Sequence, residues 1–191
     1  MKRVLVTGAT GFIGQYVVKQ LMLTGCHVMI AVREMDKAKL IFGNENLEYK
    51  FFDLNTPDEG VNYFEYFQKP DTLVHLAWEG LPNFKSEFHI KENLPRHLSF
   101  LDNMIRNGLK DIVVTGTCLE YGMIEGELDE DIPVQPTLSY AVAKHKLHEA
   151  IKDLSLQYRF NLKWLRLFYM WGDGQYEGSL IPQLKNAIYE G

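Results

Sequence analysis

Apolar runs and helix-patterned segments alternate along the whole chain. Six apolar-rich runs are typical of strands in a buried parallel sheet, and they cover residues 3–6, 27–32, 47–52, 72–76, 111–115 and 162–168. Between them, apolar residues recur at helical spacing over residues 13–24, 37–42, 61–68, 86–107 and 140–158. Gly25 and Gly108 stand where two of these helices should end. The pattern predicts an α/β protein with a doubly wound parallel sheet, whose ligands bind at the carboxyl ends of the strands.

Composition narrows the classes of protein that fit this pattern. With 191 residues, 46% of them apolar, the chain can bury one good core. The net charge of −5, without a basic block, argues against a nucleic-acid surface, and no stretch approaches the about 20 apolar residues of a membrane span. Cys26 and Cys118 lie far apart in the sequence and do not have the spacing of metal ligands. We therefore expect both to be reduced thiols, as is usual in cytoplasmic proteins. We therefore expect a cytoplasmic protein with no nucleic-acid partner, no membrane contact and no metal site.

The first predicted strand runs directly into a glycine-rich turn, in the segment VLVTGATGFIG at residues 4–14. Gly8, Gly11 and Gly14 let the backbone approach a pyrophosphate closely, and the following helix points free N–H groups at the anion. The strand before the turn and the helix after it favour a dinucleotide site. The alternative is an ordinary strand–helix turn.

A tyrosine and a lysine are spaced four residues apart in the last of these helical segments. Tyr140 and Lys144 therefore share one helical face, so the phenol and the ammonium can address the same small volume. A nearby cation favours phenolate and lowers the pKa of a tyrosine from its reference of about 10. We expect Lys144, together with the positive charge of an oxidised nicotinamide, to lower the pKa of Tyr140 toward about 7. Such a shift corresponds to roughly 4 kcal/mol of stabilisation of the phenolate relative to the phenol. The alternative is a surface pair.

A hydroxyl group follows the fifth predicted strand. Thr117 lies in the segment TGTCLEYG at residues 115–122, upstream of the tyrosine helix, and could donate a hydrogen bond to a substrate oxygen in the same crevice. The glycine turn, this hydroxyl and the YxxxK spacing are together far more specific than any one of them. Their order along the chain favours a redox site.

In these motifs the chain resembles the extended short-chain dehydrogenases/reductases of the nucleotide-sugar epimerase, dehydratase and reductase type. The segment TGATGFIG at residues 7–14 matches their cofactor fingerprint almost letter for letter, and the resemblance runs over essentially the whole chain. It implies a Rossmann fold, a nicotinamide cofactor and a nucleotide-sugar substrate. It also implies catalysis by Thr117 and by Tyr140 and Lys144 as the acid/base pair.

The resemblance also assigns binding residues. Asp53 matches a carboxylate that reads the adenine amino group, residues 75–78 match the HxA segment beside the cofactor, and Asn93 matches an asparagine behind the nicotinamide. Residues 165–172, LRLFYMWG, resemble the segment that leads into the sugar-nucleotide site. The expected cofactor-binding residues are Gly8, Thr10, Gly11, Phe12, Ile13, Gly14, Arg33, Asp53, Leu54, Leu76, Ala77, Trp78, Asn93, Thr115, Tyr140, Lys144 and Phe168. The expected substrate contacts are Trp78, Thr117, Glu120, Tyr140 and Tyr169.

The chain departs from the family pattern after its second predicted strand. An acidic residue usually stands there and accepts a hydrogen bond from the ribose 2′-hydroxyl of NAD. This chain has Arg33, and no carboxylate before Glu34. A guanidinium suits a 2′-phosphate, so we expect NADP, with NAD as the alternative.

Further departures concern the reaction. The 4,6-dehydratases of the family carry an Asp-Glu pair directly after the catalytic threonine, whereas this chain has Cys118 and Leu119, which cannot serve as general acid and base. Glu120 replaces a common valine and could reach substrate or turn to water. Tyr169 stands where an asparagine often contacts substrate.

These features favour a nucleotide-sugar 4-keto reductase. The alternatives are a 4-epimerase with tightly bound NAD, a non-catalytic dinucleotide-binding module, and a reductase of flavonoid or aldehyde carbonyls, against which the sugar-type segment 165–172 counts. We expect a dinucleotide-binding domain at residues 1–172. Residues 173–191 are expected to begin a nucleotide-sugar lobe that is largely missing from this chain.

Two long helical segments carry apolar stripes, at residues 86–107 and 140–158. In the family these helices pair across a two-fold axis and form a four-helix bundle. The resemblance therefore implies a homodimer.

Overall fold

A six-stranded parallel sheet forms the centre of the molecule in the computed structural model, which describes residues 1–43, 47–58 and 60–190. The strands lie in the order β3-β2-β1-β4-β5-β6, and every neighbouring pair is parallel. Their bounds are β1 Arg3–Thr7, β2 His27–Val32, β3 Leu47–Phe51, β4 Thr72–His75, β5 Asp111–Thr117 and β6 Asn161–Leu167. The order reverses between β1 and β4, so a doubly wound sheet opens a crevice at its carboxyl edge there.

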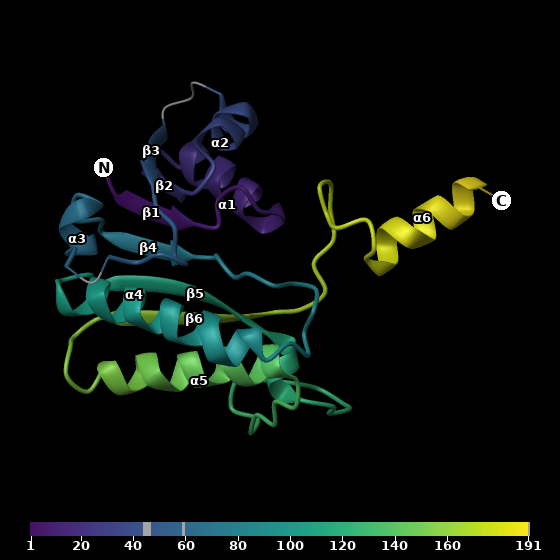
Figure 1. Ribbon diagram of the computed structural model, residues 1–191. Helices are drawn as coiled ribbons and strands as arrows, with labels where there is room; N and C mark the ends of the chain where they lie inside the picture. The colour runs from purple at the N-terminus through teal and green to yellow at the C-terminus, as the bar shows by residue number, and fades with distance from the viewer. Residues whose placement is uncertain (44–46, 59, 191) are drawn as a thin grey trace.

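Helices cover both faces of the sheet, with α1 and α2 on one side and α3, α4 and α5 on the other (Figure 1). Their bounds are α1 Phe12–Leu23, α2 Met35–Phe42, α3 Tyr63–Tyr66, α4 Leu94–Arg106, α5 Ser139–Leu154 and α6 Leu180–Glu190, with a π-helical turn η1 His89–Asn93 and a 3-10 turn η2 Cys118–Tyr121. Alternate residues of β1 feed two separate cores. Val4 and Val6 pack with the α1 and α2 side, while Leu5 packs with Phe100 and Leu147 from α4 and α5. The sheet is therefore buried on both faces, as its apolar runs predict.

The structure confirms the doubly wound sheet and all six strands, and it corrects several helices. The single helix expected over residues 86–107 is the turn η1 followed by α4, which has a proline in its first turn, where a missing N–H costs nothing. The helix expected over 140–158 ends at Leu154, and the one expected over 61–68 is only four residues long. No helix was predicted over 180–190, where α6 lies.

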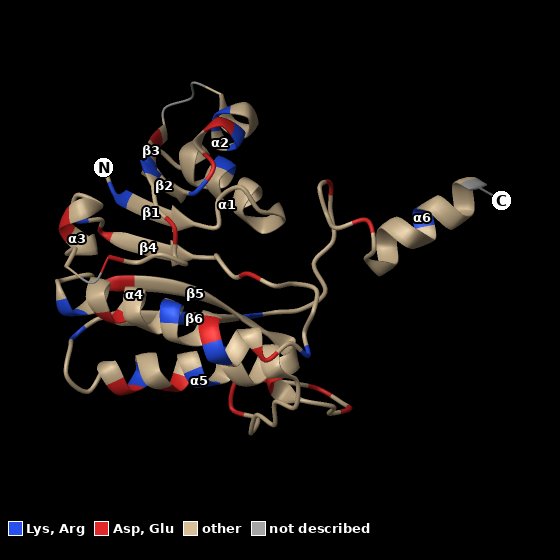
Figure 2. Ribbon diagram, in the orientation of Figure 1, with Lys and Arg blue, Asp and Glu red and all other residues tan. Residues whose placement is uncertain are grey.

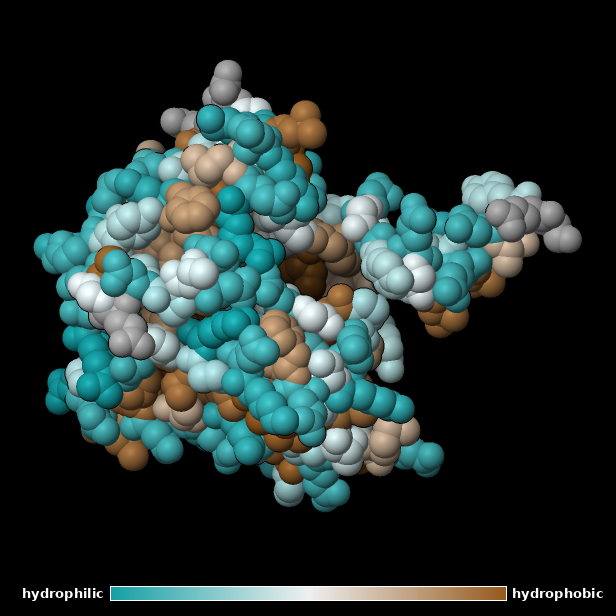
Figure 3. All heavy atoms as spheres, viewed as in Figure 1, coloured by the Kyte–Doolittle hydropathy of each residue, from teal (hydrophilic) through white to brown (hydrophobic). Residues whose placement is uncertain are grey.

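The segment after β6 leaves the body of the molecule and leads to α6, which projects away from the sheet (Figure 1). Apolar atoms gather in the hollow between this segment and the body and along α6 (Figure 3). Leu180, Leu184 and Ile188 of α6 are 78%, 52% and 70% exposed.

Acidic and basic side chains are interspersed on the helices of both faces (Figure 2). Opposite charges pair along exposed helical turns, as Glu92 does with Arg96 and Asp102 with Arg106. Among the described residues, no helix is long and apolar enough to cross a membrane.

The glycine turn between β1 and α1 depends on unusually close backbone contacts. Gly8 has a φ of +72°, and a Cβ atom there would lie 2.6 Å from the backbone nitrogen of Ala77 on the neighbouring strand end. A Cβ atom on Gly14 would lie 2.1 Å from the carbonyl oxygen of Gly8. Both contacts are with backbone atoms, which cannot move aside. Only glycine therefore allows α1 to begin this close to β1.

The substitution Gly14→Ala tests this close approach. Helix propensity alone would make alanine at a helical position more stable by about 1 kcal/mol. We expect the opposite, a loss of about 2 kcal/mol in the free energy of unfolding, because the methyl group would overlap the Gly8 carbonyl. Urea unfolding measures the change. Gly25→Ala is the control: its Cβ would meet nothing within 4 Å, so its φ of +75° alone should cost about 1 kcal/mol, and an equal loss in both variants would contradict the argument.

Candidate active site

Four strand ends and the glycine turn enclose one pocket at the carboxyl edge of the sheet. Its lining includes ten of the residues that the sequence assigns to the cofactor: Gly8, Thr10, Gly11, Arg33, Asp53, Leu54, Leu76, Ala77, Trp78 and Asn93. Phe12, Ile13, Gly14, Thr115, Tyr140, Lys144 and Phe168 are not in this lining. The other eight lining residues, which the sequence did not assign to the cofactor, are Thr7, Ala31, Val32, Phe52, Asn55, Glu79, Arg96 and His97. Glu79 directly follows the segment 75–78 that the sequence assigned to the cofactor, so extending that segment by one residue could have found it.

The pocket has the features that a dinucleotide requires. The turn at Gly8 and Gly11 exposes backbone rather than side chains to the pocket, and a Cβ atom at Gly8 would overlap the wall formed by Leu76 and Ala77. Helix α1 begins directly behind this turn, so its first N–H groups lie next to the pocket. Asp53 also lines the pocket, and it follows β3, which lies two strands from β1 in the sheet. The residues present therefore fit a dinucleotide with its pyrophosphate on the turn.

The catalytic residues expected from the sequence come together beside this pocket. Thr117 ends β5, and Tyr140 and Lys144 lie on the first turns of α5. Burial raises the pKa of the Tyr140 phenol, and the Thr117 side chain opposes that rise, so the two groups are neighbours. The Tyr140 ring packs at 5.9 Å from Trp78 and 5.6 Å from Phe84, measured between ring centroids, and only 8% of the residue is exposed. The phenol is thus held in a partly dry site between β4, β5 and α5.

Lys144 is buried behind the tyrosine. Its Nζ donates a hydrogen bond to the carbonyl oxygen of Thr115 at 2.7 Å and lies 4.0 Å from the centroid of the Trp78 ring. Burial lowers its pKa to about 7, and the negative charge of Glu120 opposes this shift. Both contacts favour a cation on the nitrogen, which is how a lysine with 1% exposure is accommodated.

In the protein itself, burial and then the negative charge of Glu120 raise the pKa of Tyr140 to about 12. The expected fall toward about 7 combined Lys144 with the positive charge of a bound oxidised nicotinamide, so Lys144 alone does not produce it. The physical reason is that the Lys144 ammonium is directed to the Thr115 carbonyl and to Trp78, while the dry surroundings disfavour a phenolate. Tyr140 is therefore a neutral phenol at neutral pH and can give a proton.

Glu120 is completely buried, so it does not turn to water. Its carboxylate accepts hydrogen bonds from the backbone N–H of Thr117 at 2.8 Å and from Trp164 Nε1 at 3.1 Å, and it pairs with Arg166 at 3.2 Å. Thr117 and Glu120 also form a capping box around the turn η2. Glu120 thus holds Thr117 in place and links it to β6. Its predicted contact with substrate stays a prediction.

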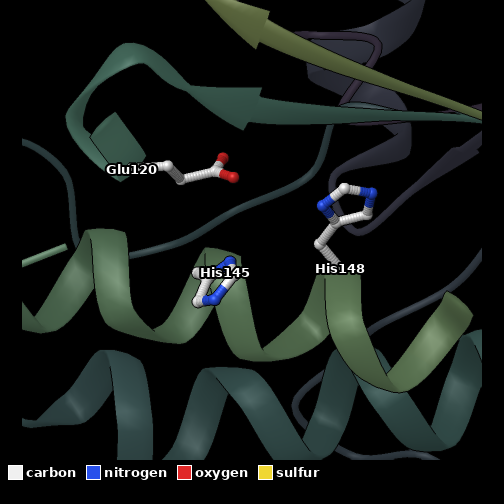
Figure 4. A group of neighbouring side chains, drawn as sticks. All are labelled: Glu120, His145 and His148. Atoms are coloured by element: carbon white, nitrogen blue, oxygen red, sulfur yellow. The ribbon is translucent and has the colours of Figure 1, made fainter. Parts of the chain in front are cut away.

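Two histidines of α5, His145 and His148, point toward the Glu120 carboxylate (Figure 4). One potential ligand atom from each of the three residues lies within 4.8 Å of the others. Spacing along the sequence could not show this grouping, because Glu120 comes from a different element. The carboxylate, however, already accepts bonds from Thr117, Trp164 and Arg166, and the Arg166 guanidinium would repel a metal ion.

A row of buried side chains supports the floor of the pocket. His75 Nδ1 lies 2.8 Å from the Thr7 hydroxyl, and His75 Nε2 lies 2.7 Å from His97 Nδ1. The His97 ring stacks on Trp78 at 4.5 Å. Burial, followed by the positive charge of Lys144, lowers the pKa of His75 to about 3. His75 is therefore a neutral packing residue.

Two predicted site residues lie apart from this assembly. The chain turns outward after β6, so Phe168 is 48% exposed and Tyr169 is 91% exposed. Their assigned contacts with cofactor and substrate stay predictions.

A parallel sheet with a glycine turn, a strand-end threonine and a YxxxK helix defines a nicotinamide-dinucleotide-binding oxidoreductase fold of the short-chain type. The model of the NAD-dependent epimerase/dehydratase family matches residues 4–191, and the chain belongs to this family. This confirms the resemblance drawn from the sequence. Its relatives are nucleotide-sugar epimerases, dehydratases and dehydrogenases of the extended short-chain superfamily.

Three proteins illustrate the likeness. The chain is 31% identical over 185 residues to the dTDP-6-deoxy-L-talose 4-dehydrogenase (NAD(+)) of Aggregatibacter actinomycetemcomitans, covering 96% of this chain and 67% of that protein. The UDP-N-acetylglucosamine 4-epimerase of Methanobrevibacter ruminantium M1 superimposes with a TM-score of 0.83 at 26% identity, over 100% of this chain and 63% of that one. The UDP-glucuronic acid 4-epimerase of Bacillus cereus, solved with UDP-glucuronic acid and NAD, superimposes with a TM-score of 0.82 at 20% identity, over 98% and 63%. The chain thus spans about two thirds of the length of these proteins.

The substitution Glu120→Gln tests the buried ion pair. Removing the charge leaves the Arg166 guanidinium, only 14% exposed in its side chain, without its counter-ion. We expect the free energy of unfolding to fall by about 3 kcal/mol, measured by urea unfolding. Glu87→Gln removes the same charge from an exposed helical pair with Lys91 and should change nothing measurable. Equal stability of the two variants would show that the buried pair does not hold β5 to β6.

The neutral His75 predicts a pH dependence of stability. Its pKa is about 3 in the fold against about 6.5 in the unfolded chain, so between these values the unfolded chain binds the extra proton. Stability should therefore fall as the pH drops from 6.5, with His75 contributing up to about 1.4 kcal/mol per pH unit. Urea unfolding between pH 7 and pH 5 measures the slope. The slope should be shallower in His75→Asn, and an unchanged slope would contradict the assignment.

Proposed function

We propose that this chain carries the dinucleotide-binding and catalytic half of a nucleotide-sugar oxidoreductase that reduces a 4-keto sugar. The observation that supports this most is the grouping of Thr117, Tyr140 and Lys144 beside a glycine-lined pocket. In this family, that grouping serves carbonyl and alcohol chemistry at a sugar carbon. The activity of the whole protein and its sugar substrate are part of the proposal.

Each catalytic residue has a role that its surroundings support. When bound, the nicotinamide supplies a hydride to the carbonyl carbon. The Tyr140 phenol, protonated because its pKa is about 12, gives its proton to the carbonyl oxygen. The Thr117 hydroxyl donates a hydrogen bond to that oxygen as negative charge develops on it. Lys144, buried one helical turn after Tyr140, is the cation that this proposal assigns to stabilising the phenolate that remains.

The high pKa of Tyr140 supports reduction as the starting direction. A neutral phenol is ready to donate a proton, whereas oxidation of an alcohol needs a phenolate to accept one. The 4-epimerase alternative, with tightly bound NAD, needs both directions in turn and stays open. Dehydration is disfavoured because Cys118 and Leu119 offer no acid/base pair, and burial raises the pKa of the Cys118 thiol.

The remaining expectations form part of the same proposal. Residues 1–172 would bind the dinucleotide, and residues 173–191 would begin the nucleotide-sugar lobe, with Gly191 outside the described residues. A homodimer through the helices at residues 86–107 and 140–158, a cytoplasmic location and the absence of nucleic-acid and membrane partners also stay predictions. The proposal of NADP depends on Arg33. The alternative, NAD, is favoured by the similarity to the talose dehydrogenase, which is an NAD(+) enzyme by name.

The substitution Tyr140→Phe tests the proposed function. Without its proton donor the protein should lose about a hundredfold or more in kcat with a 4-keto nucleotide sugar. The dissociation constant for the reduced dinucleotide should stay within about twofold, because Tyr140 lies outside the lining of the dinucleotide pocket. The loss of reduced-cofactor absorbance measures turnover.

Tyr66→Phe is the matched control, since the Tyr66 hydroxyl donates a hydrogen bond to the Phe51 carbonyl at 2.7 Å and Tyr66 lies in α3, not in the helix α5 that carries Tyr140. Isomer formation without net cofactor consumption would favour the epimerase. Dinucleotide binding with no turnover by the unmodified chain would instead support the non-catalytic binding module.

A further inference from the structure

Arg33 and Glu79 form an ion pair at the mouth of the dinucleotide pocket. Arg33 directly follows β2, and Glu79 lies four residues after β4. Strand β1 lies between β2 and β4 in the sheet, so the pair crosses above the carboxyl end of β1, where the glycine turn begins. Both side chains are partly exposed, at 49% and 34%. The pair can therefore open and close without unfolding its neighbours.

A hydrogen bond from a buried side chain fixes the backbone of Glu79. Its carbonyl oxygen accepts a hydrogen bond at 2.9 Å from the side-chain amide of Asn93, a residue that is only 1% exposed. The same loop begins at His75, which is buried and bonded to Thr7 and His97. Glu79 thus projects from a fixed loop, and the longer arginine side chain reaches across to it.

The neighbouring carboxylate of Glu34 does not compete for Arg33. Glu34 lies 3.5 Å from Lys37 one helical turn further along, and both side chains are well exposed. Within the described parts of the chain, Glu79 is the residue that neutralises Arg33.

We infer that Glu79 sets the choice between NADH and NADPH by holding the Arg33 guanidinium. The inference rests on the proposed dinucleotide site. A 2′-phosphate carries nearly two negative charges at neutral pH, so it binds Arg33 only by drawing that side chain away from Glu79. Glu79 is then left unpaired next to a second anion, and like charges at close range are costly.

A ribose 2′-hydroxyl imposes no such cost. It is neutral and can donate a hydrogen bond to a carboxylate while the ion pair stays closed. Glu79 therefore supplies, from the β4 side, the acidic group that the family usually places at the end of β2. This would make the site tolerant of NADH despite its arginine, and it would limit the affinity for NADPH.

Glu79→Gln tests the inference. The affinities of the whole chain for NADH and for NADPH are measured by calorimetry or by quenching of tryptophan fluorescence. The variant frees Arg33, so the ratio of NADPH to NADH affinity should rise about tenfold, which corresponds to about 1.4 kcal/mol. Glu34→Gln is the matched control, because it removes the same charge one residue from Arg33 and should leave the ratio unchanged. The Glu79→Gln effect should shrink in high salt, since the charges are partly exposed.

Arg33→Ala separates action through the arginine from simple repulsion. In that background, Glu79→Gln should change the affinity ratio less than twofold. A tenfold change in the Arg33→Ala background would overturn the proposed role of Glu79. An unchanged ratio in Glu79→Gln that still binds NADH would do the same, and either result would leave the proposed dinucleotide site standing. Failure of the unmodified chain to bind either dinucleotide would overturn the proposed site and this inference together.

Discussion

The buried carboxylate of Glu120 organises the catalytic end of the molecule. A negative charge with no exposure must be matched by donors, and this one is matched by a backbone N–H of β5, an indole of β6 and a guanidinium of β6. Those bonds fix the end of β5, where Thr117 stands. After burial, the same charge is the next cause of the raised pKa of Tyr140, and it opposes the fall that burial produces in the pKa of Lys144. One side chain therefore positions the threonine and helps to keep the phenol neutral.

Different interactions fix the structure at the two ends of the sheet's carboxyl edge. Around β1 the geometry depends on glycine, because a Cβ atom at Gly8 or Gly14 would overlap backbone atoms. Around β5 and β6 it depends on charged and aromatic side chains that meet from distant parts of the chain, such as Glu120 with Arg166 and Lys144 with Trp78. The first end is a closely packed glycine turn, which the proposed function assigns to the phosphates. The second surrounds the phenol that is proposed to give the proton with charged and aromatic groups.

This difference explains how much could be predicted from the sequence. The strands and the glycine turn are local patterns, so their positions follow from a few consecutive residues. The grouping of Thr117, Tyr140 and Lys144 could also be predicted, from a strand end followed by a YxxxK helix, and the structure brings the three together. Their catalytic roles stay predictions. The pKa of Tyr140 could not be predicted in the same way. It depends on burial and on Glu120, whose pairing with Arg166 spans 46 positions of the chain.

The same limit applies to the cofactor pocket. From the sequence, Arg33 stands alone at the end of β2 and indicates a site for a 2′-phosphate. The sheet order brings the end of β4 within reach, and Glu79 then neutralises that charge. A residue's chemistry at a strand end is thus set by the neighbouring strand as much as by its own segment. Because a doubly wound sheet interleaves strands from separate segments, its specificity-determining pairs are the part that sequence order conceals.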